Sequence, residues 1–262
     1  MKLSQNLKLA IDASIQAGKK IIEIYNSDNF NLEYKLDDSP LTIADSASNK
    51  IIENILEASN IPILSEEGNI LDFNNRKNLN QLWIVDPLDG AKEFIKKNNE
   101  FTVNIALIEN SKPVIGVIYA PALNVMYFSE KKLGAYKILI NNSDEFDHSN
   151  PLRLPLVEKF NEYKVLTSRS HLNDKTLDYI DNLKVNNLKV VSIPMGSSLK
   201  FCLLAEGLAD CYPRFSPCME WDTAAGQIIC EEAGFKVVDL KTMKPIIYNR
   251  ENLINNYFIA KK

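Results

Sequence analysis

Segment 83–90, Trp-Ile-Val-Asp-Pro-Leu-Asp-Gly, constrains the fold more than any other part of the chain. Its apolar start predicts a buried strand, and two carboxylates follow, Asp86 and Asp89, before a glycine turn. Because Pro87 has no backbone donor, we expect the strand to end before it. Open α/β sheets bind their ligands beyond the carboxyl ends of their strands. Asp86 and Asp89 are therefore candidate site residues.

Two carboxylates this close repel each other unless a positive charge lies between them. Carboxylate oxygens are also the ligands that hard divalent cations prefer. For an Asp-x-x-Asp pair taken alone, an exposed acidic turn is the simpler interpretation. What favours a site is the presence of further acidic residues at other expected element ends.

These further acidic residues are Glu66, Glu67, Asp45 and Asp222. Glu66 and Glu67 follow a short apolar run, Asp45 begins a helical pattern, and Asp222 opens another. Asp45 and Asp222 have an alternative role, because a carboxylate near a helix start can cap its free N–H groups. Together with the Asp-x-x-Asp pair, they predict an oxygen-rich site suited to Mg²⁺ and not to a softer metal.

A second candidate region follows the turn signal that ends at Gly196. Ser197 and Ser198 open an expected helix, where hydroxyl and N–H groups suit a phosphate or a ribose. Lys200 can pair with a second phosphate, and Arg214 can contact that phosphate or stack on a base. The alternative is that Ser197 caps the helix while Lys200 and Arg214 are solvated surface charges.

Three motifs together resemble the inositol monophosphatase superfamily of lithium-sensitive, magnesium-dependent phosphatases. They are Ser-Glu-Glu at 65–67, the 83–90 segment, and Trp-Asp-Thr-Ala-Ala-Gly at 221–226. The segments at 92–95, 101–108, 119–121, 124–127, 168–171, 196–202 and 212–215 resemble its CysQ-type branch, the bacterial 3′(2′),5′-bisphosphate nucleotidases. The resemblance spans nearly the whole chain in the right order.

The resemblance implies a site for two Mg²⁺ ions, with three as an alternative. Glu66, Asp86 and the Leu88 carbonyl would hold one ion. Asp86, Asp89 and Asp222 would hold the second and contact the substrate phosphate. Such a pair stabilises both the attacking and the leaving oxygen of an in-line displacement.

The resemblance also implies roles for four residues around the metals. Glu67 would lie next to the ligands, and Asp45 would lie beside the attacking water. The N–H groups of Gly90 and Ala91 would cradle the phosphate at a helix start.

Ala91 departs from the family pattern, which has threonine after Asp-Gly. In the family, that hydroxyl works with the aspartate matching Asp45 to orient and deprotonate water. Two explanations stay open: the chain is an inactivated variant, or Asp45 engages the water directly or through a second water.

The hydrophobic periodicity predicts an α/β protein with two halves, residues 1–140 and 151–262, joined by a polar linker at 141–150. The first half would carry most metal ligands, and the second would carry Asp222 and the specificity residues. Helices are expected at 2–25, 45–59, 173–182, 197–206 and 221–233. Strands are expected at 82–86, 101–109, 114–120, 125–129, 134–140, 163–168, 188–193, 209–212 and 235–239, the middle ones of the first half forming an antiparallel meander. The resemblance implies a layered α/β/α/β/α sandwich with the metal site between the halves.

Composition excludes several functional classes. A net charge of −4 over 262 residues lacks the basic excess that is typical of nucleic-acid-binding proteins. No run of 18 apolar residues exists, and the amino-terminal pattern lacks a signal-peptide core, so we expect a cytoplasmic protein. Peripheral association with the inner membrane, which is attached to the family, is not demanded by any segment. The four cysteines predict buried core residues, with Cys218 as a candidate exposed thiol. His148 and His171 are expected to be exposed.

The sequence thus predicts a phosphatase whose small-molecule partner is a bisphosphate nucleotide. The resemblance implies hydrolysis of the 3′-phosphate of adenosine 3′,5′-bisphosphate (PAP) to AMP in sulfur assimilation, with the sulfated nucleotide PAPS, which would give APS, as an alternative substrate. Competing hypotheses are an inositol monophosphatase or related sugar phosphatase, and a catalytically silent nucleotide-binding protein. The oligomeric state and the lithium sensitivity do not follow from the sequence.

Overall fold

The computed structural model describes residues 1–27, 33–34, 40–68, 70–140, 151–157, 162–170, 172–185 and 189–262. The expected linker at 141–150, with His148, lies outside the described residues, as does His171.

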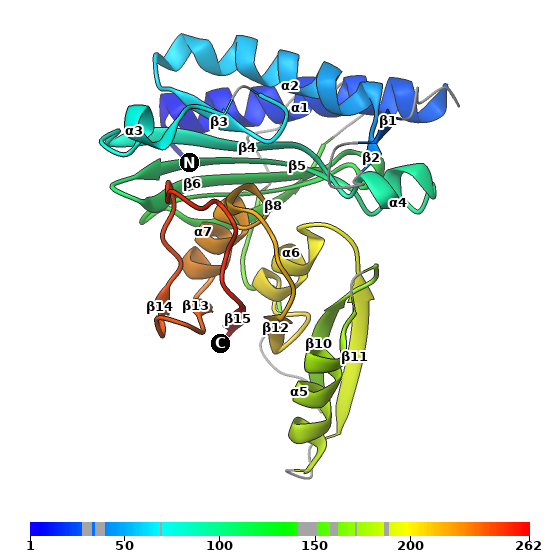
Figure 1. Ribbon diagram of the computed structural model, residues 1–262. Helices are drawn as coiled ribbons and strands as arrows, with labels where there is room; N and C mark the ends of the chain where they lie inside the picture. The colour runs from blue at the N-terminus through cyan, green and yellow to red at the C-terminus, as the bar shows by residue number, and fades with distance from the viewer. Residues whose placement is uncertain are drawn as a thin grey trace.

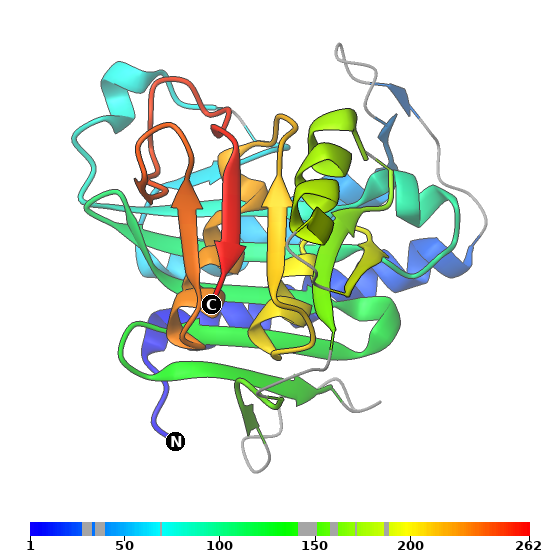
Figure 2. The same cartoon turned by 90° about the horizontal axis from the view of Figure 1, so that it is seen from below.

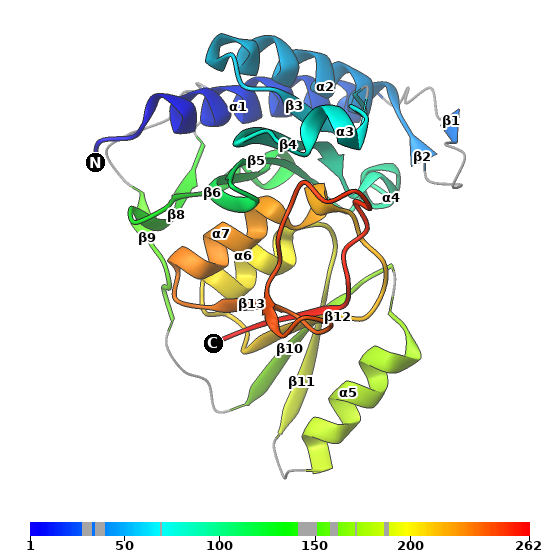
Figure 3. The same ribbon diagram turned by 60° about the vertical axis from the view of Figure 1, so that its left-hand side comes forward.

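The chain folds into five alternating layers (Figure 1). Helices α1 (Gln5–Asn26) and α2 (Ile43–Leu56) form the outer layer, with the short 3-10 helix η1 (Glu57–Ser59) after them. A seven-stranded sheet lies beneath them, followed by α6 (Leu199–Ala205) and α7 (Ala224–Glu232). A six-stranded sheet and α5 (Asp174–Val185) complete the stack (Figure 3). This order confirms the predicted α/β/α/β/α sandwich.

The seven-stranded sheet has the order β3-β4-β5-β6-β7-β8-β9. Its strands are β3 (Ile63–Ser65), β4 (Gln81–Asp89), β5 (Thr102–Glu109), β6 (Lys112–Ala120), β7 (Val125–Glu130), β8 (Gly134–Leu139) and β9 (Leu152–Arg153). β3 runs parallel to β4, and each later pair is antiparallel. The expected meander from residue 101 to residue 140 is confirmed.

Strand β4 differs from its prediction in a way that builds the site. It does not end before Pro87 but continues to Asp89. Asp86 pairs with Asn104 and Asp89 with Thr102, with a register shift between them, so two residues of β4 face one residue of β5. Such a bulge leaves the missing N–H of proline outside the ladder. It also turns two side chains three positions apart to one face, where a regular strand would point them to opposite faces.

The second sheet has the order β11-β10-β12-β15-β13-β14. Its strands are β10 (Tyr163–Ser168), β11 (Val190–Met195), β12 (Cys211–Arg214), β13 (Lys236–Asp239), β14 (Lys244–Pro245) and β15 (Phe258–Lys261). β10, β11 and β12 are parallel, whereas β15 is antiparallel to β12 and β13 and lies between them (Figure 2). The predicted alternation of strands and helices is therefore confirmed, with β14 and β15 as additional strands.

Smaller elements complete the chain. The strands β1 (Glu33–Tyr34) and β2 (Pro40–Leu41) pair with each other. The helices α3 (Phe73–Arg76) and α4 (Ala91–Ile95) flank β4. The 3-10 helix η2 (Pro121–Leu123) follows β6, and the 3-10 helix η3 (Glu220–Asp222) precedes α7.

The core divides along the two faces of the first sheet. In β4, Trp83 and Val85 face the cluster under α1 and α2, while Leu82 and Ile84 face the cluster around α6 and α7. β4 therefore has a continuous apolar run, because both of its faces are buried. All four cysteines are buried, including Cys218, the candidate exposed thiol. Among the described helices, none has the length and apolarity needed to cross a membrane.

Candidate active site

A cavity of about 250 Å³ lies where the two sheets' loops meet. Its lining residues come both from 1–140 and from 151–262. Its lining includes almost all of the predicted site residues: Asp45, Glu66, Asp86, Leu88, Asp89, Gly90, Ala91, Gly196, Ser197, Ser198, Lys200, Arg214 and Asp222. Glu67 alone among the predicted residues is not part of the lining; it lies half-buried in the turn after β3.

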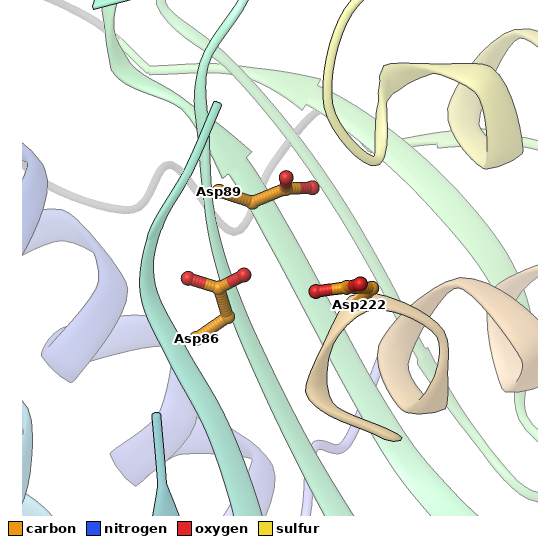
Figure 4. Close-up of side chains that lie close together, drawn as sticks. All are labelled: Asp86, Asp89 and Asp222. Carbon is orange, nitrogen blue, oxygen red and sulfur yellow. The ribbon is translucent and has the colours of Figure 1, made fainter. Parts of the chain in front are cut away.

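Three carboxylates converge on the floor of this cavity. Asp86 and Asp89 come from the bulged end of β4, and Asp222 comes from η3 (Figure 4). One oxygen of each lies within 4.8 Å of the others. The sequence separation between Asp89 and Asp222 shows that this grouping depends on the tertiary structure.

The electrostatics of the cluster fit a bound cation. Burial raises the pKa of Asp86 well above its usual value, and the neighbouring carboxylates of Glu66, Asp89, Asp222 and Asp45 raise it further. Burial, followed by Asp89 and Glu66, raises the pKa of Asp222 to about 8. Since like charges in a buried site are unfavourable without compensation, this donor set suits a hard divalent cation.

The alternative helix-capping roles of Asp45 and Asp222 are also present. Asp45 Oδ2 accepts hydrogen bonds from Thr42 N (2.8 Å) and Thr42 Oγ1 (2.7 Å) at the start of α2. Asp222 Oδ2 accepts from Met219 N at 2.8 Å. Both carboxylates also line the cavity, so capping and a role in the site do not exclude each other. Capping fixes the orientation of each carboxylate from one side.

The turn after β4 brings backbone groups to the cavity. Gly90 has a φ of 98° and precedes α4, a conformation that a residue with a side chain rarely adopts. A Cβ at Gly90 would lie 3.0 Å from the Glu100 carbonyl oxygen and 3.3 Å from Ser197 Cβ. Ala91 opens α4 and lines the cavity with a methyl group in place of the family hydroxyl.

Asn104 is a site residue that the sequence reasoning missed. Its Nδ2 donates to Ser198 Oγ (2.8 Å) and to Asp89 Oδ2 (3.3 Å), and Ser198 Oγ donates to Asp89 Oδ2 at 2.7 Å. These bonds hold the Asp89 carboxylate in place. The available signal was a polar amide within a strand that is otherwise nearly all apolar, since such a group needs a partner when buried.

Lys200 is not a solvated surface charge, so that alternative is wrong for Lys200. Arg214 is half-buried. Lys200 is 3% exposed, and its Nζ donates to the carbonyl oxygens of Ser197 (2.6 Å) and Met195 (3.1 Å). Burial lowers the pKa of Lys200 to about 8. Arg214 donates from Nη2 to Pro217 O at 3.0 Å, while its Nε is buried without a hydrogen-bond partner among the described residues. These two side chains, which we call the cationic wall, add positive charge to a lining that also holds the acidic cluster.

An acidic floor, a helix start and a cationic wall inside a layered α/β sandwich define the class of metal-dependent phosphatases. The chain belongs to the inositol monophosphatase family, whose model matches residues 2–261. That family is metal-dependent, and the resemblance drawn from the motifs is thus confirmed.

Several individual proteins are similar to this chain over nearly its whole length. The chain is 44% identical over 256 residues to the 3′(2′),5′-bisphosphate nucleotidase CysQ of Buchnera aphidicola, covering 93% of this chain and 89% of the relative. It is 40% identical over 247 residues to the protein of the same name from Escherichia coli K12, covering 92% and 94%. The crystal structure of CysQ from Bacteroides thetaiotaomicron superposes with a TM-score of 0.88 at 44% identity, covering 98% of this chain and 96% of that chain.

Proposed function

We propose that this chain is a Mg²⁺-dependent 3′(2′),5′-bisphosphate nucleotidase that hydrolyses the 3′-phosphate of PAP to AMP and phosphate. The relatives named for this activity cover nearly the whole chain. The observation that carries the proposal is that Arg214 and Lys200 line the same cavity as the acidic cluster. A substrate with two phosphates on one ribose uses positive charge at a distance from the metal site, whereas a sugar monophosphate does not need it.

The acidic cluster would hold the metal ions. Asp86, Asp89 and Asp222 would ligate one Mg²⁺, while Asp86, Glu66 and the Leu88 carbonyl would ligate another. When bound, Mg²⁺ supplies positive charge that stabilises the attacking and the leaving oxygen of the displacement. We therefore propose that the site binds two Mg²⁺ ions.

The remaining residues bind the substrate and orient the water. The N–H groups of Gly90 and Ala91 at the start of α4 would bind the scissile phosphate. Asp45 would accept a proton from the attacking water, because its Oδ2 is held by Thr42 and its carboxylate faces the cavity. The water oxygen then bonds to phosphorus, the bond to the ribose 3′-oxygen breaks, and that oxygen takes up a proton from solvent water.

A Mg²⁺ titration of phosphate release tests the proposal. PAP, PAPS and inositol 1-phosphate are compared with the wild-type chain, and chromatography of the nucleotide product shows which phosphate has left. We expect AMP as product and a preference of about 100-fold in kcat/KM for PAP over inositol phosphate, because a site built for two phosphates leaves buried polar groups unpaired otherwise. A preference for inositol phosphate would support the sugar phosphatase instead.

A catalytically silent nucleotide-binding protein is the second candidate, and Ala91 is the observation that favours it. A positioned proton-transfer group contributes about 10²–10⁴ in rate, so its loss can leave binding intact and turnover low. Tight binding of PAP, measured by calorimetry, without phosphate release at saturating Mg²⁺ would establish this candidate. The cytoplasmic location stays a prediction for either function.

A further inference from the structure

Two charged side chains outside the cavity connect the halves of the fold at its rim. Glu100 lies in the loop between α4 and β5, and Arg169 directly follows β10. Arg169 donates from Nε to Glu100 Oε2 at 2.7 Å and from Nη2 to Glu100 Oε1 at 2.6 Å. This is a bidentate, charge-assisted pair, the strongest common geometry between an arginine and a carboxylate. Neither residue is part of the cavity lining that the described residues form.

Both partners of this pair also hold loop 194–198, our name for the last two residues of β11 together with the turn before α6. Gly196, Ser197 and Ser198 of this loop line the cavity. Arg169 Nη2 donates to the carbonyl oxygen of Pro194 at 3.0 Å, and Arg169 N donates to that of Met195 at 3.3 Å. Gly196 N donates to Glu100 Oε2 at 2.7 Å. The side chains of the pair therefore fix the outer side of the loop by two further bonds, and the backbone N–H of Arg169 adds a third.

Close packing leaves little room for loop 194–198 to move. A Cβ at Gly196 would lie 2.8 Å from Glu93 Cγ and 2.9 Å from the Glu100 carbonyl oxygen. Ser197 has a φ of 44°, in the left-handed region that residues with a Cβ rarely occupy. A backbone in such a conformation persists only where its surroundings enforce it.

The inner side of the same loop holds Lys200. The carbonyl oxygens of Met195 and Ser197 accept hydrogen bonds from Lys200 Nζ, so the loop determines where this ammonium group lies. Ser198, by contrast, is held independently by Asp89 and Asn104. A shift of residues 194–197 would therefore move the Lys200 ammonium group more than the acidic floor.

We propose that Glu100 and Arg169 form a rim latch, a pair of positioning residues that sets the affinity for the phosphate remote from the metal site. The latch acts through loop 194–198 on Lys200 and leaves metal binding to the acidic cluster. This inference rests on the proposed function, because it assigns the remote phosphate of a bisphosphate nucleotide to the cationic wall.

Two substrates that share the scissile phosphate test the latch. PAP carries the remote phosphate, and adenosine 3′-monophosphate lacks it. We expect Arg169→Ala to raise KM for PAP about 10-fold and to change KM for the monophosphate by less than about 2-fold, with kcat and the Mg²⁺ dependence nearly unchanged. Arg169→Lys should fall between the two, because one ammonium group cannot reproduce the parallel pair of bonds.

The matched control is Lys137→Ala. Lys137 pairs with Glu206 at 2.7 Å and likewise joins β8 of the first half to the end of α6. Neither of these two residues lines the cavity among the described residues. The control should lower the melting temperature without changing the ratio of the two KM values. Melting curves of each variant show that it is folded.

The outcomes separate the latch from the function. If wild type neither binds PAP by calorimetry nor cleaves it, the proposed function fails, and the latch with it. If wild type binds PAP, the latch is overturned when Arg169→Ala leaves the PAP dissociation constant unchanged, or when it weakens both nucleotides equally. Calorimetry supplies this comparison even if turnover is low.

Discussion

Replacing Asp222 by asparagine is expected to stabilise the metal-free protein. Asp222 is one of three carboxylates whose oxygens lie within 4.8 Å of one another. Asparagine has nearly the same shape, and its side-chain oxygen can still accept the hydrogen bond that Met219 N donates at 2.8 Å. The substitution therefore removes charge repulsion while the cap of η3 remains.

The effect should depend on pH in a defined direction. Burial, followed by Asp89 and Glu66, raises the pKa of Asp222 from 3.8 to about 8. Between these values the folded chain binds more protons than the unfolded chain, so stability decreases as pH rises through this window. Asp86, whose pKa is raised by burial and the same neighbours, acts in the same direction. The benefit of Asp222→Asn should be small near pH 5 and largest near about pH 9.

The pKa shift bounds the magnitude. Roughly four pKa units correspond to at most about 6 kcal/mol of unfolding free energy. Because the cavity is open to counterions, which screen the repulsion, we expect about 2 kcal/mol in buffer. For a chain of this size, that is a rise in melting temperature of about 4–8 °C.

Thermal unfolding followed by circular dichroism, in chelator and in Mg²⁺ at both pH values, measures the effect. Wild type should gain stability from Mg²⁺, whereas Asp222→Asn should gain much less, because it lacks a ligand. The control is Asp239→Asn, another buried aspartate, whose carboxylate accepts from Lys241 N (2.7 Å) and lies outside the acidic cluster. It should lose stability at both pH values, because both oxygens of Asp239 accept hydrogen bonds, the second from Asn256 Nδ2 at 2.8 Å, and asparagine keeps only one acceptor oxygen. An Asp222→Asn protein that melts below wild type in chelator at high pH would refute the reasoning.

Three further substitutions test the other walls of the site. Ala91→Thr should raise kcat for PAP by about 10²-fold with KM unchanged, because it restores a proton-transfer hydroxyl; an unchanged high rate would show that Asp45 acts without it. Arg214→Leu should raise KM for PAP about 10- to 100-fold and affect adenosine 3′-monophosphate less, and equal effects would remove Arg214 from the remote phosphate. Ser198→Ala should raise the Mg²⁺ concentration needed for half-maximal thermal stabilisation about 10-fold, because Asp89 loses a hydrogen-bond donor at 2.7 Å; no change would make that bond dispensable.

Most secondary structure could be predicted from local pattern. The strand expected at 163–168 matches β10 (Tyr163–Ser168), and the meander strands agree to within a few residues. β15 (Phe258–Lys261) was not predicted, although it lies at the centre of the second sheet. A strand of four residues offers too little periodicity to be distinguished from a short apolar loop.

Those parts of the candidate site were predicted whose function follows from residue type and from position at the end of an element. Acidic residues at element ends indicate oxygen ligands, and serines at a helix start indicate an anion, whatever their surroundings. Burial was harder to predict. A surface position for Lys200 stayed open, because its burial depends on how α6 packs, although the carbonyl oxygens that accept from its ammonium group lie only three and five residues before it.

The sequence by itself determined the family, the order of the elements and the identity of the metal-ligand candidates, because spacing and residue chemistry are properties of short segments. The tertiary structure decided what those segments do together. The bulge around Pro87 turns Asp86 and Asp89 to one face, and the stacking of the two sheets brings Asp222 to them and Arg169 to Glu100. These contacts join residues far apart in the chain, and their geometry depends on the packing of whole layers, which no local pattern records.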